Sequence, residues 1–296
     1  MNLSNSPVTS FILNQHEFFI KRDDLLNDSF NGNKARKLYY YLSNDFPNVD
    51  TIVSYGGNQS NLMYALSCLA RLKNWKFIYY TKSLSKQAQT IINNNFNLSI
   101  NNGMKIICLQ DKFEQFISNY KPYCNELFIH QGGHQPEAES GLKILANEIS
   151  RWAIEKGFHD LNIFLPSGTG TSAFFLQKHL PQYKVFTTNC VGTSQYLIKQ
   201  ISALDDNNYI SPMILDNNQY QFAVPDLNLL ETINKVEKFS NIQFDRIYDP
   251  VGWRILLNNL CKITGPILYI HCGGLTGNNS MNLRYTYLQK KQSNKP

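Results

Sequence analysis

Two neighbouring segments decide how this chain folds: Lys21-Arg22-Asp23-Asp24-Leu25 and Asn31-Gly32-Asn33-Lys34-Ala35-Arg36-Lys37. The apolar run Phe18-Phe19-Ile20 predicts a strand before them, and the polar residues between the two segments end it. A helical pattern resumes at Leu38, which places Lys34 in the first turn of a helix. The helix dipole disfavours an ammonium there, so we expect a lowered pKa for Lys34 and a better amine nucleophile toward an aldehyde.

A lysine in such a segment more often belongs to a solvated basic face, here shared with Arg36 and Lys37. The surrounding residues favour a functional lysine instead. The string KRDDL…GNKARKL resembles the lysine segment of the 1-aminocyclopropane-1-carboxylate deaminase and D-cysteine desulfhydrase family of pyridoxal-phosphate enzymes. In that family the lysine of the GNK motif carries the cofactor as a Schiff base, and the resemblance assigns this role to Lys34.

The composition is that of an ordinary soluble globular protein. The 296 residues are 43% hydrophobic and 17% charged, enough for one large or two modest domains. The formal net charge of +6 is scattered along the chain and accompanies no nucleic-acid-binding motif, so we expect no nucleic-acid partner. No apolar stretch approaches the roughly 18 residues of a membrane span, and no secretory signal is visible, so we expect a cytoplasmic protein. A homodimer is the commonest assembly for such an enzyme.

The cysteines predict neither a metal site nor a disulfide framework. No pair has zinc-ligand or redox spacing. Most lie in apolar runs, so we expect reduced and buried thiols. The six are Cys68, Cys108, Cys124, Cys190, Cys261 and Cys272.

Short apolar runs alternate with amphipathic segments, which predicts an α/β fold with a mainly parallel sheet. The expected strands are Thr51 to Ser54, Lys76 to Tyr80, Lys105 to Leu109, Glu126 to His130, Leu161 to Leu165, Lys184 to Asn189 and Pro266 to His271. The expected helices are Gln59 to Leu72, Glu137 to Glu155, Thr171 to Leu180, Ser194 to Ala203 and Leu227 to Phe239.

The resemblance adds a domain plan that composition alone does not give. It implies the fold-type II architecture, with two open, twisted, mostly parallel sheets flanked by helices and the cofactor between the domains. Residues 1–37 plus 146–296 would form the large cofactor domain, and residues 38–145 a smaller inserted α/β domain.

A glycine-bearing turn, Tyr55-Gly56-Gly57-Asn58-Gln59-Ser60-Asn61, follows an expected strand and opens a helix. Such turns bind ligands at the carboxyl edge of an open sheet, although Ser60 and Asn61 could equally be simple helix caps. GGxQSN also resembles a family motif. The resemblance implies that Asn61 contacts the cofactor ring hydroxyl or the substrate carboxylate, that Ser60 transfers a proton or binds the carboxylate, and that Gln59 helps form the anion pocket.

A second loop, Pro166-Ser167-Gly168-Thr169-Gly170-Thr171-Ser172, has the small residues that hold a phosphate monoester without a metal. A dinucleotide loop, and so a nucleotide-binding oxidoreductase, is the alternative. Against it, the third glycine of GxGxxG is missing and Asn189 stands where an acid is expected. The resemblance names the phosphate ligands as Gly168, Thr169, Gly170 and Thr171.

His134 lies in a further loop that enters a helix capped by Pro136. A loop histidine can donate a proton, but more often it has no such role.

The sequence departs from its relatives after Asp249-Pro250-Val251. The family carries a tyrosine next, and the deaminase then has a glutamate that keeps the pyridine nitrogen protonated. Here Gly252 and Trp253 supply neither group. In the HTGG-like turn, Cys272 replaces the threonine of the desulfhydrases; it is either a core filler or a neutral thiol facing the ring nitrogen. A neutral partner suits loss of a β-substituent better than cyclopropane ring opening.

The motifs together predict a deaminase or lyase that uses pyridoxal 5'-phosphate on a small amino acid, giving a 2-oxo acid and ammonia as a D-cysteine desulfhydrase does. Lys34 and Ser60 are the expected catalytic residues. The expected cofactor-binding residues are Lys34, Asn61, Gly168, Thr169, Gly170, Thr171 and Cys272. 1-Aminocyclopropane-1-carboxylate deaminase activity and a cofactor-binding protein without turnover remain alternatives.

Overall fold

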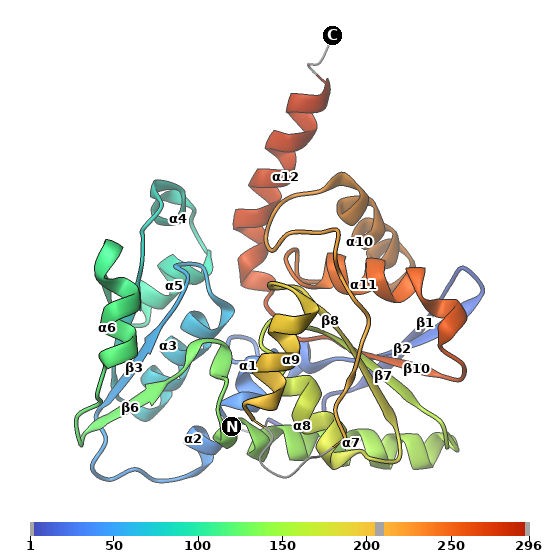
Figure 1. The fold of residues 1–296 in the computed structure, drawn as a ribbon, viewed down its shortest axis with the longest axis horizontal. Coiled ribbons are helices and arrows are strands. Elements are labelled where there is room, and N and C mark those ends of the chain that lie inside the picture. Colours follow the sequence, from blue (N-terminus) through green and yellow to red (C-terminus); the bar gives the residue numbers. More distant parts are fainter. Residues whose placement is uncertain (1–2, 205–209, 294–296) are drawn as a thin grey trace.

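A computed structural model describes residues 3–204 and 210–293. Its strands form two sheets, one of six strands ordered β1-β2-β10-β7-β8-β9 and one of four strands ordered β5-β4-β3-β6. The two sheets lie side by side with helices around each of them (Figure 1). The expected fold class, two mostly parallel α/β sheets flanked by helices, is confirmed.

Strand pairing is parallel throughout, except for the antiparallel hairpin of β1 and β2. The six-stranded sheet contains β1 (Val8–Leu13), β2 (His16–Lys21), β10 (Ile267–Ile270), β7 (Asn162–Ser167), β8 (Lys184–Asn189) and β9 (Met213–Ile214). The four-stranded sheet contains β5 (Met104–Cys108), β4 (Lys76–Thr81), β3 (Thr51–Tyr55) and β6 (Glu126–Ile129). The sequence analysis missed only the two outermost strands of the larger sheet, β1 and β9.

The central strand β7 explains why helices must cover both faces of the larger sheet. Successive side chains of a strand point to opposite faces. Ile163 and Leu165 pack in one core with helix residues such as Phe174, whereas Phe164 packs in the core on the opposite face with Trp253. Parallel sheets are buried on both sides in this way.

The long helices lie within a few residues of their predicted positions. The predicted ones are α3 (Asn61–Lys73), α7 (Glu139–Lys156), α8 (Thr171–His179), α9 (Ser194–Ser202) and α10 (Leu227–Ser240). The others are α1 (Gly32–Lys37), α2 (Tyr39–Ser43), α4 (Lys86–Thr90), α5 (Asn95–Asn101), α6 (Phe113–Asn119), α11 (Asp249–Asn258) and α12 (Asn278–Ser293). Helix α12 extends away from the body in Figure 1.

The prediction that most cysteines are buried is wrong for three of the six. Cys68 and Cys190 are buried, but Cys108, Cys124 and Cys261 are exposed. Cys108 ends the edge strand β5, so an apolar run there need not face a core. All six are free thiols.

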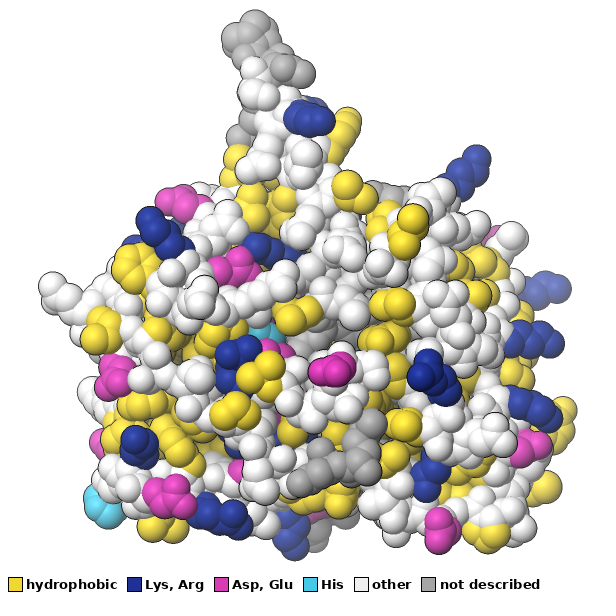
Figure 2. Space-filling view, turned by 180° about the vertical axis from the view of Figure 1, so that it is seen from behind, with side chains coloured by type: hydrophobic (Ala, Val, Ile, Leu, Met, Phe, Trp, Pro, Cys, Tyr) yellow, Lys and Arg dark blue, Asp and Glu magenta, His cyan; other side chains and the backbone are white. Residues whose placement is uncertain are grey.

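The surface carries charges of both signs. On the face opposite to that of Figure 1, Lys and Arg side chains are separated by neutral and acidic ones (Figure 2). Among the helices in the described part of the chain, none is both long enough and apolar enough to cross a membrane.

Candidate active site

A cavity of about 670 Å³ is lined by residues of both sheets. The turns after β3, β7 and β10 all reach it, because the carboxyl ends of these parallel strands face the same space. The structure brings together every residue that the sequence analysis named as a site candidate. They are Lys34, Gln59, Ser60, Asn61, Gly168, Thr169, Gly170, Thr171 and Cys272.

Helix α1 is held against the turn after β10 by a close backbone approach. Gly32 has φ +67°, and a Cβ atom there would overlap the carbonyl oxygen of Cys272. The amide of Asn33 donates to the same oxygen over 3.1 Å. Only glycine tolerates both this backbone conformation and this contact. The GNK motif and the Cys272 turn, distant in sequence, therefore meet, and Lys34 is placed beside Cys272.

Lys34 is half-buried and lines the cavity. Burial lowers the pKa of Lys34, while its neighbours Cys272 and Asp245 act in the opposite direction. The direction of the shift is the predicted one, but its main cause is desolvation and not the helix dipole. An amine in this state is closer to the neutral form that attacks an aldehyde.

Lys37 is a second lysine of the site, which the sequence analysis placed on a possible solvated face. Only 4% of Lys37 is exposed, and its Nζ donates to the carbonyl of Gly132 over 2.8 Å. Burial and the charge of Lys34 hold the pKa of Lys37 well below its usual range. The spacing from Lys34 was the available signal, since residues three apart share a helix face.

The turn after β3 is fixed by a buried amide from α5. Asn95 Nδ2 donates to Asn61 Oδ1 over 2.7 Å and to the carbonyl of Gln59 over 3.0 Å. Ser60 is the helix cap of α3, because its Oγ accepts from the amides of Leu62 and Met63. Ser60 therefore has a structural role as well as a place on the cavity wall.

The loop after β7 has the form of an anion cradle. Gly170 has φ +72°, and the hydroxyls of Thr169 and Thr171 lie 2.8 Å apart. The buried Oγ of Ser172 has no hydrogen-bond partner within residues 3–204 and 210–293. A Cβ on Gly132 would lie 2.8 Å from Thr169 Cγ2, so the loop that receives Lys37 packs against this cradle.

His134 lines the cavity, but its side chain is hydrogen-bonded to a backbone carbonyl. Its Nε2 lies 2.7 Å from the carbonyl of Gln200, which can only accept, so this nitrogen carries the proton. Burial lowers the pKa of His134, which favours the neutral ring.

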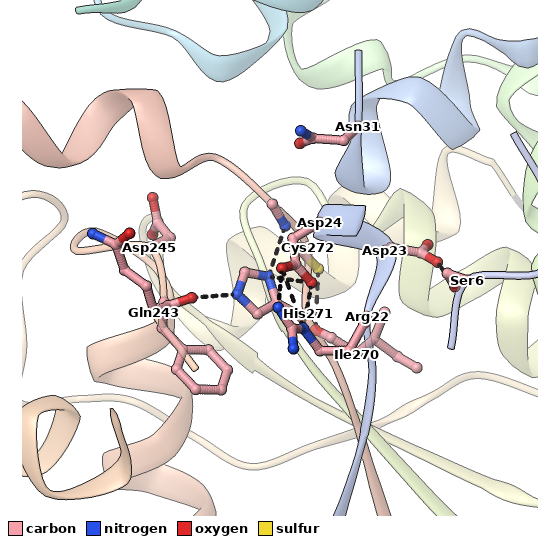
Figure 3. A network of polar contacts seen from close by, with 12 residues as sticks. Ser6, Arg22, Asp23, Asp24, Asn31, Gln243, Asp245, Ile270, His271 and Cys272 are labelled. Carbon is pink, nitrogen blue, oxygen red and sulfur yellow. Dashed lines mark hydrogen bonds and ion pairs between the residues drawn. The ribbon is translucent and has the colours of Figure 1, made fainter. Parts of the chain in front are cut away.

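The turn after β10 is organised by His271, which is fully buried (Figure 3). Its Nε2 donates to the carbonyl of Gln243 over 2.7 Å, and its Nδ1 accepts from the amide of Gly273 over 3.1 Å. Next to it, burial raises the pKa of Cys272 far above its usual range, with the charge of Asp249 adding to the effect. Cys272 is therefore a neutral thiol.

Neither residue after Asp249-Pro250-Val251 supplies a polar group to the site. Trp253 is fully buried and stacks on Tyr269 with ring centroids 4.3 Å apart. A Cβ on Gly252 would already lie 2.8 Å from the Tyr269 hydroxyl.

The polar groups on this wall come from the start of α11 and the residues just before it; the sequence analysis quoted Asp249 only within a family motif and did not name Asp245. They are Asp245, Tyr248 and Asp249. An acid at position 245, directly after the buried Phe244, was the one visible signal.

No protein-family model matches the sequence, but two curated proteins do. A Thermotoga maritima protein named provisionally as a 1-aminocyclopropane-1-carboxylate deaminase is 23% identical over 283 residues, which cover 88% of this chain and 89% of that protein. A D-cysteine desulfhydrase of Serratia proteamaculans is 24% identical over 305 residues, covering 87% and 86%. The resemblance inferred from the motifs is confirmed by these homologues.

Solved structures share the fold. An ACC deaminase homologue superposes with a TM-score of 0.75 at 20% identity, over 97% of this chain and 93% of that chain. A hydrogen sulfide-producing enzyme of Fusobacterium nucleatum gives a TM-score of 0.62 at 16% identity, over 92% and 94%. The architecture is therefore that of the fold-type II pyridoxal-phosphate enzymes.

Proposed function

We propose that this chain is a deaminase or lyase that uses pyridoxal 5'-phosphate on a small amino acid, in the manner of a D-cysteine desulfhydrase. The observation that carries the proposal is that Lys34, with a pKa lowered by burial, lies on the wall of the same cavity as the turns after β3, β7 and β10. The proteins of similar sequence support this reading by their names.

The residues present fit the cofactor. An amine with a lowered pKa suits its aldehyde, and the unpartnered Ser172 hydroxyl in a cradle of small residues suits its phosphate. Bound there, pyridoxal phosphate supplies an aldehyde and an electron-withdrawing ring that stabilises negative charge at the substrate's α-carbon. The proposed phosphate-binding residues are Lys37, Gly168, Thr169, Gly170, Thr171 and Ser172.

The other residues that line the cavity would have separate roles in binding the substrate and in moving its proton. Lys34 Nζ would hold the cofactor and move the α-proton, while the amide of Asn61 and the residues Gln59 and Ser60 would bind the carboxylate. Cys272 would face the ring nitrogen as a neutral thiol, which gives the ring no counter-charge. This arrangement favours loss of a β-substituent, with 1-aminocyclopropane-1-carboxylate ring opening as the second candidate.

We also propose that the two sheets mark two domains, residues 38–145 and residues 1–37 plus 146–296, with the cofactor between them. All four strands of the smaller sheet fall within 38–145. Three exposed free thiols are compatible with a reducing compartment, for which we propose the cytoplasm.

A panel of D- and L-amino acids tests the function. The protein loaded with pyridoxal phosphate should show a visible band that borohydride removes, and it should release 2-oxo acid from at least one amino acid, with sulfide if that is D-cysteine. A visible band without turnover on any member would identify a cofactor-binding protein. Absence of the band would refute the proposal and would favour the alternative of a nucleotide-binding oxidoreductase.

Replacing Lys37 by methionine should weaken cofactor binding by about 10- to 100-fold, because a charge-assisted hydrogen bond is worth roughly 1.5–3 kcal/mol. The covalent band should still form at high concentration, since Lys34 is unchanged. The apoprotein is titrated with pyridoxal phosphate and, as the control, with pyridoxal, which lacks the phosphate. An equal loss of affinity for both compounds would contradict the phosphate assignment.

A further inference from the structure

Phe222 is an exposed aromatic residue at the opening of the cavity. It lines the cavity, and it is 44% exposed. Its ring packs on that of Tyr248, with the ring centroids 5.5 Å apart. A single exposed apolar side chain is ordinary on a protein surface, so exposure alone assigns no role to Phe222. Two features of the surrounding segment show that the fold holds this ring in place.

The first feature is the backbone conformation beside Phe222. Phe222 and Ala223 are the central residues of a turn. The amide of Val224 closes this turn by donating to the carbonyl of Gln221 over 3.2 Å. Ala223 has φ +55°, whereas every other described non-glycine residue with a positive φ is an asparagine or a glutamine. Alanine has no polar side chain to compensate for this conformation, and strain kept at the edge of a cavity indicates a functional turn.

The second feature is the attachment of the turn to the sheet. Asn217 is buried, and its Nδ2 donates to the carbonyl of Asn189 in β8 over 3.0 Å and to that of Tyr220 over 2.9 Å. Asn217 Oδ1 accepts from the amide of Tyr220 over 2.9 Å. Tyr220 is buried in a small core, and Tyr248 packs against the same core. Phe222, which follows closely in the chain, is therefore held over Tyr248.

Tyr248 connects this aromatic pair to both ends of the site. A Cβ on Gly168, in the proposed phosphate loop, would lie 3.5 Å from Tyr248 Cε1. At the other end, the backbone amide of Tyr248 donates to Asp245 Oδ1. A Cβ on Gly274 would lie 3.2 Å from Asp245 Oδ2 and 2.5 Å from Asn61 Nδ2. The aromatic pair therefore lies along the cavity between the proposed carboxylate-binding amide and the proposed phosphate loop.

The side of the cavity formed by Val191, Phe222 and Tyr248, here called the apolar wall, carries no charge near neutral pH. Val191 lines the cavity, and its Cγ2 would lie 3.7 Å from a Cβ on Gly168. Burial raises the pKa of Tyr248 above its usual range, so the phenol stays neutral. A surface of this kind stabilises an apolar group, above all an aromatic one, by removing its area from water and by ring packing.

We infer that the substrate is a cysteine whose sulfur bears an apolar, aromatic-sized group, and that Phe222 is the residue that selects it. The inference rests on the proposed function and names its substrate class. In the reaction the Cα–H and Cβ–S bonds break, and the sulfur leaves with the electron pair of its bond to carbon and gains a proton. One water molecule is consumed in releasing the 2-oxo acid and ammonium, so no oxidant or reductant is required.

Binding of 3-phenylpropanoate tests the apolar wall without any reaction, because this acid has no amine. Calorimetry in the presence of inorganic phosphate compares it with propanoate, which lacks the ring. We expect Phe222→Ala to weaken the binding of 3-phenylpropanoate about 5- to 20-fold more than that of propanoate, because a ring contact is lost. Absence of 3-phenylpropanoate binding to the native protein, or an equal loss for both acids in the variant, would overturn the inference.

Two further variants control for a general effect on the fold. Phe222→Tyr keeps the ring and should recover most of the affinity for 3-phenylpropanoate. Phe239→Ala removes an exposed phenylalanine of α10 that does not line the cavity, so its affinity should stay within about 2-fold of the native value. A loss in Phe239→Ala as large as that in Phe222→Ala would contradict a local role of Phe222.

Turnover by the loaded enzyme gives the second readout. We expect the native enzyme to have a higher kcat/KM for S-benzylcysteine than for cysteine of the same configuration. In Phe222→Ala the ratio of the two kcat/KM values should fall about 5- to 20-fold, mainly through the KM for S-benzylcysteine. An unchanged ratio would show that Phe222 does not select the substrate.

These results are separable from those that test the proposed function. If the protein forms no visible band with pyridoxal phosphate, the proposed function fails, yet the binding of the two acids still decides whether the apolar wall receives a ring. If cysteine is turned over but the ratio is the same in Phe222→Ala, the proposed function stands and the inferred substrate class is wrong.

Discussion

Replacing Lys34 by alanine is expected to abolish the visible band with pyridoxal phosphate and to lower turnover by at least about 10⁴-fold, since in the proposed function this one side chain would hold the cofactor and move the proton. Its amine lies on the cavity wall with a pKa lowered by burial, and it forms no ion pair within 4.0 Å in the described part of the chain. Stability should change by no more than about 1 kcal/mol, because alanine suits the helix and the cost of burying the amine is removed.

The measurement combines absorbance, borohydride trapping with peptide mapping, and urea unfolding. Lys143→Ala, which removes an exposed lysine of α7, is the matched control and should keep the band and the turnover. A Lys34→Ala protein that still traps the cofactor would refute the assignment. Lys37 would then be the first residue to map, because it is a buried lysine that also lines the cavity.

The parts of the site that were predictable are those carried by local sequence. A strand followed by small residues and a helix was enough to place Asn61 and the loop of Gly168 to Thr171 at the carboxyl edge of the sheets. A short continuous apolar run predicted β7, because a strand that is buried on both faces needs apolar side chains on each of them. The motif order then indicated which turns share a cavity.

The burial of charged residues was not predictable from the same patterns. Arg36 and Lys37 carry the sequence signature of a solvated face, and only tertiary contacts with α7 and with the loop of Gly132 bury them. Asp245 was missed for the same reason, since only the fold places it on the cavity wall. Helix α12 was missed because it lacks an apolar stripe, and its Leu283 and Tyr287 are exposed.

Replacing Arg36 by methionine is expected to destabilise the protein by about 3–5 kcal/mol, because a buried carboxylate would lose its cation. The guanidinium is fully buried and donates to both Asp23 and Glu148 over 2.8 to 3.0 Å. Lys21 also pairs with Glu148 at 2.7 Å, so two cations balance two anions. Methionine restores the volume but leaves one negative charge in excess.

The exposed pair of Lys76 and Asp50 provides the control. Its partners are 76% and 52% exposed, so Lys76→Met should cost no more than about 1 kcal/mol in urea unfolding. A loss of similar size in both variants would mean that the Arg36 network contributes no more than a surface ion pair.

The pH dependence of the Arg36 effect identifies its origin. Burial acts to raise the pKa of Glu148, but the hydrogen bonds and charge of Arg36 outweigh it and hold that pKa below its ordinary value of 4.5. A depressed carboxyl pKa contributes stability above the unfolded-state value, and this contribution is lost as the pH falls. The difference in unfolding free energy between the native protein and Arg36→Met should therefore be largest above pH 5 and should decrease toward pH 3. If this difference in unfolding free energy did not change with pH, the loss would come from packing, because only the carboxylates can make the difference depend on pH.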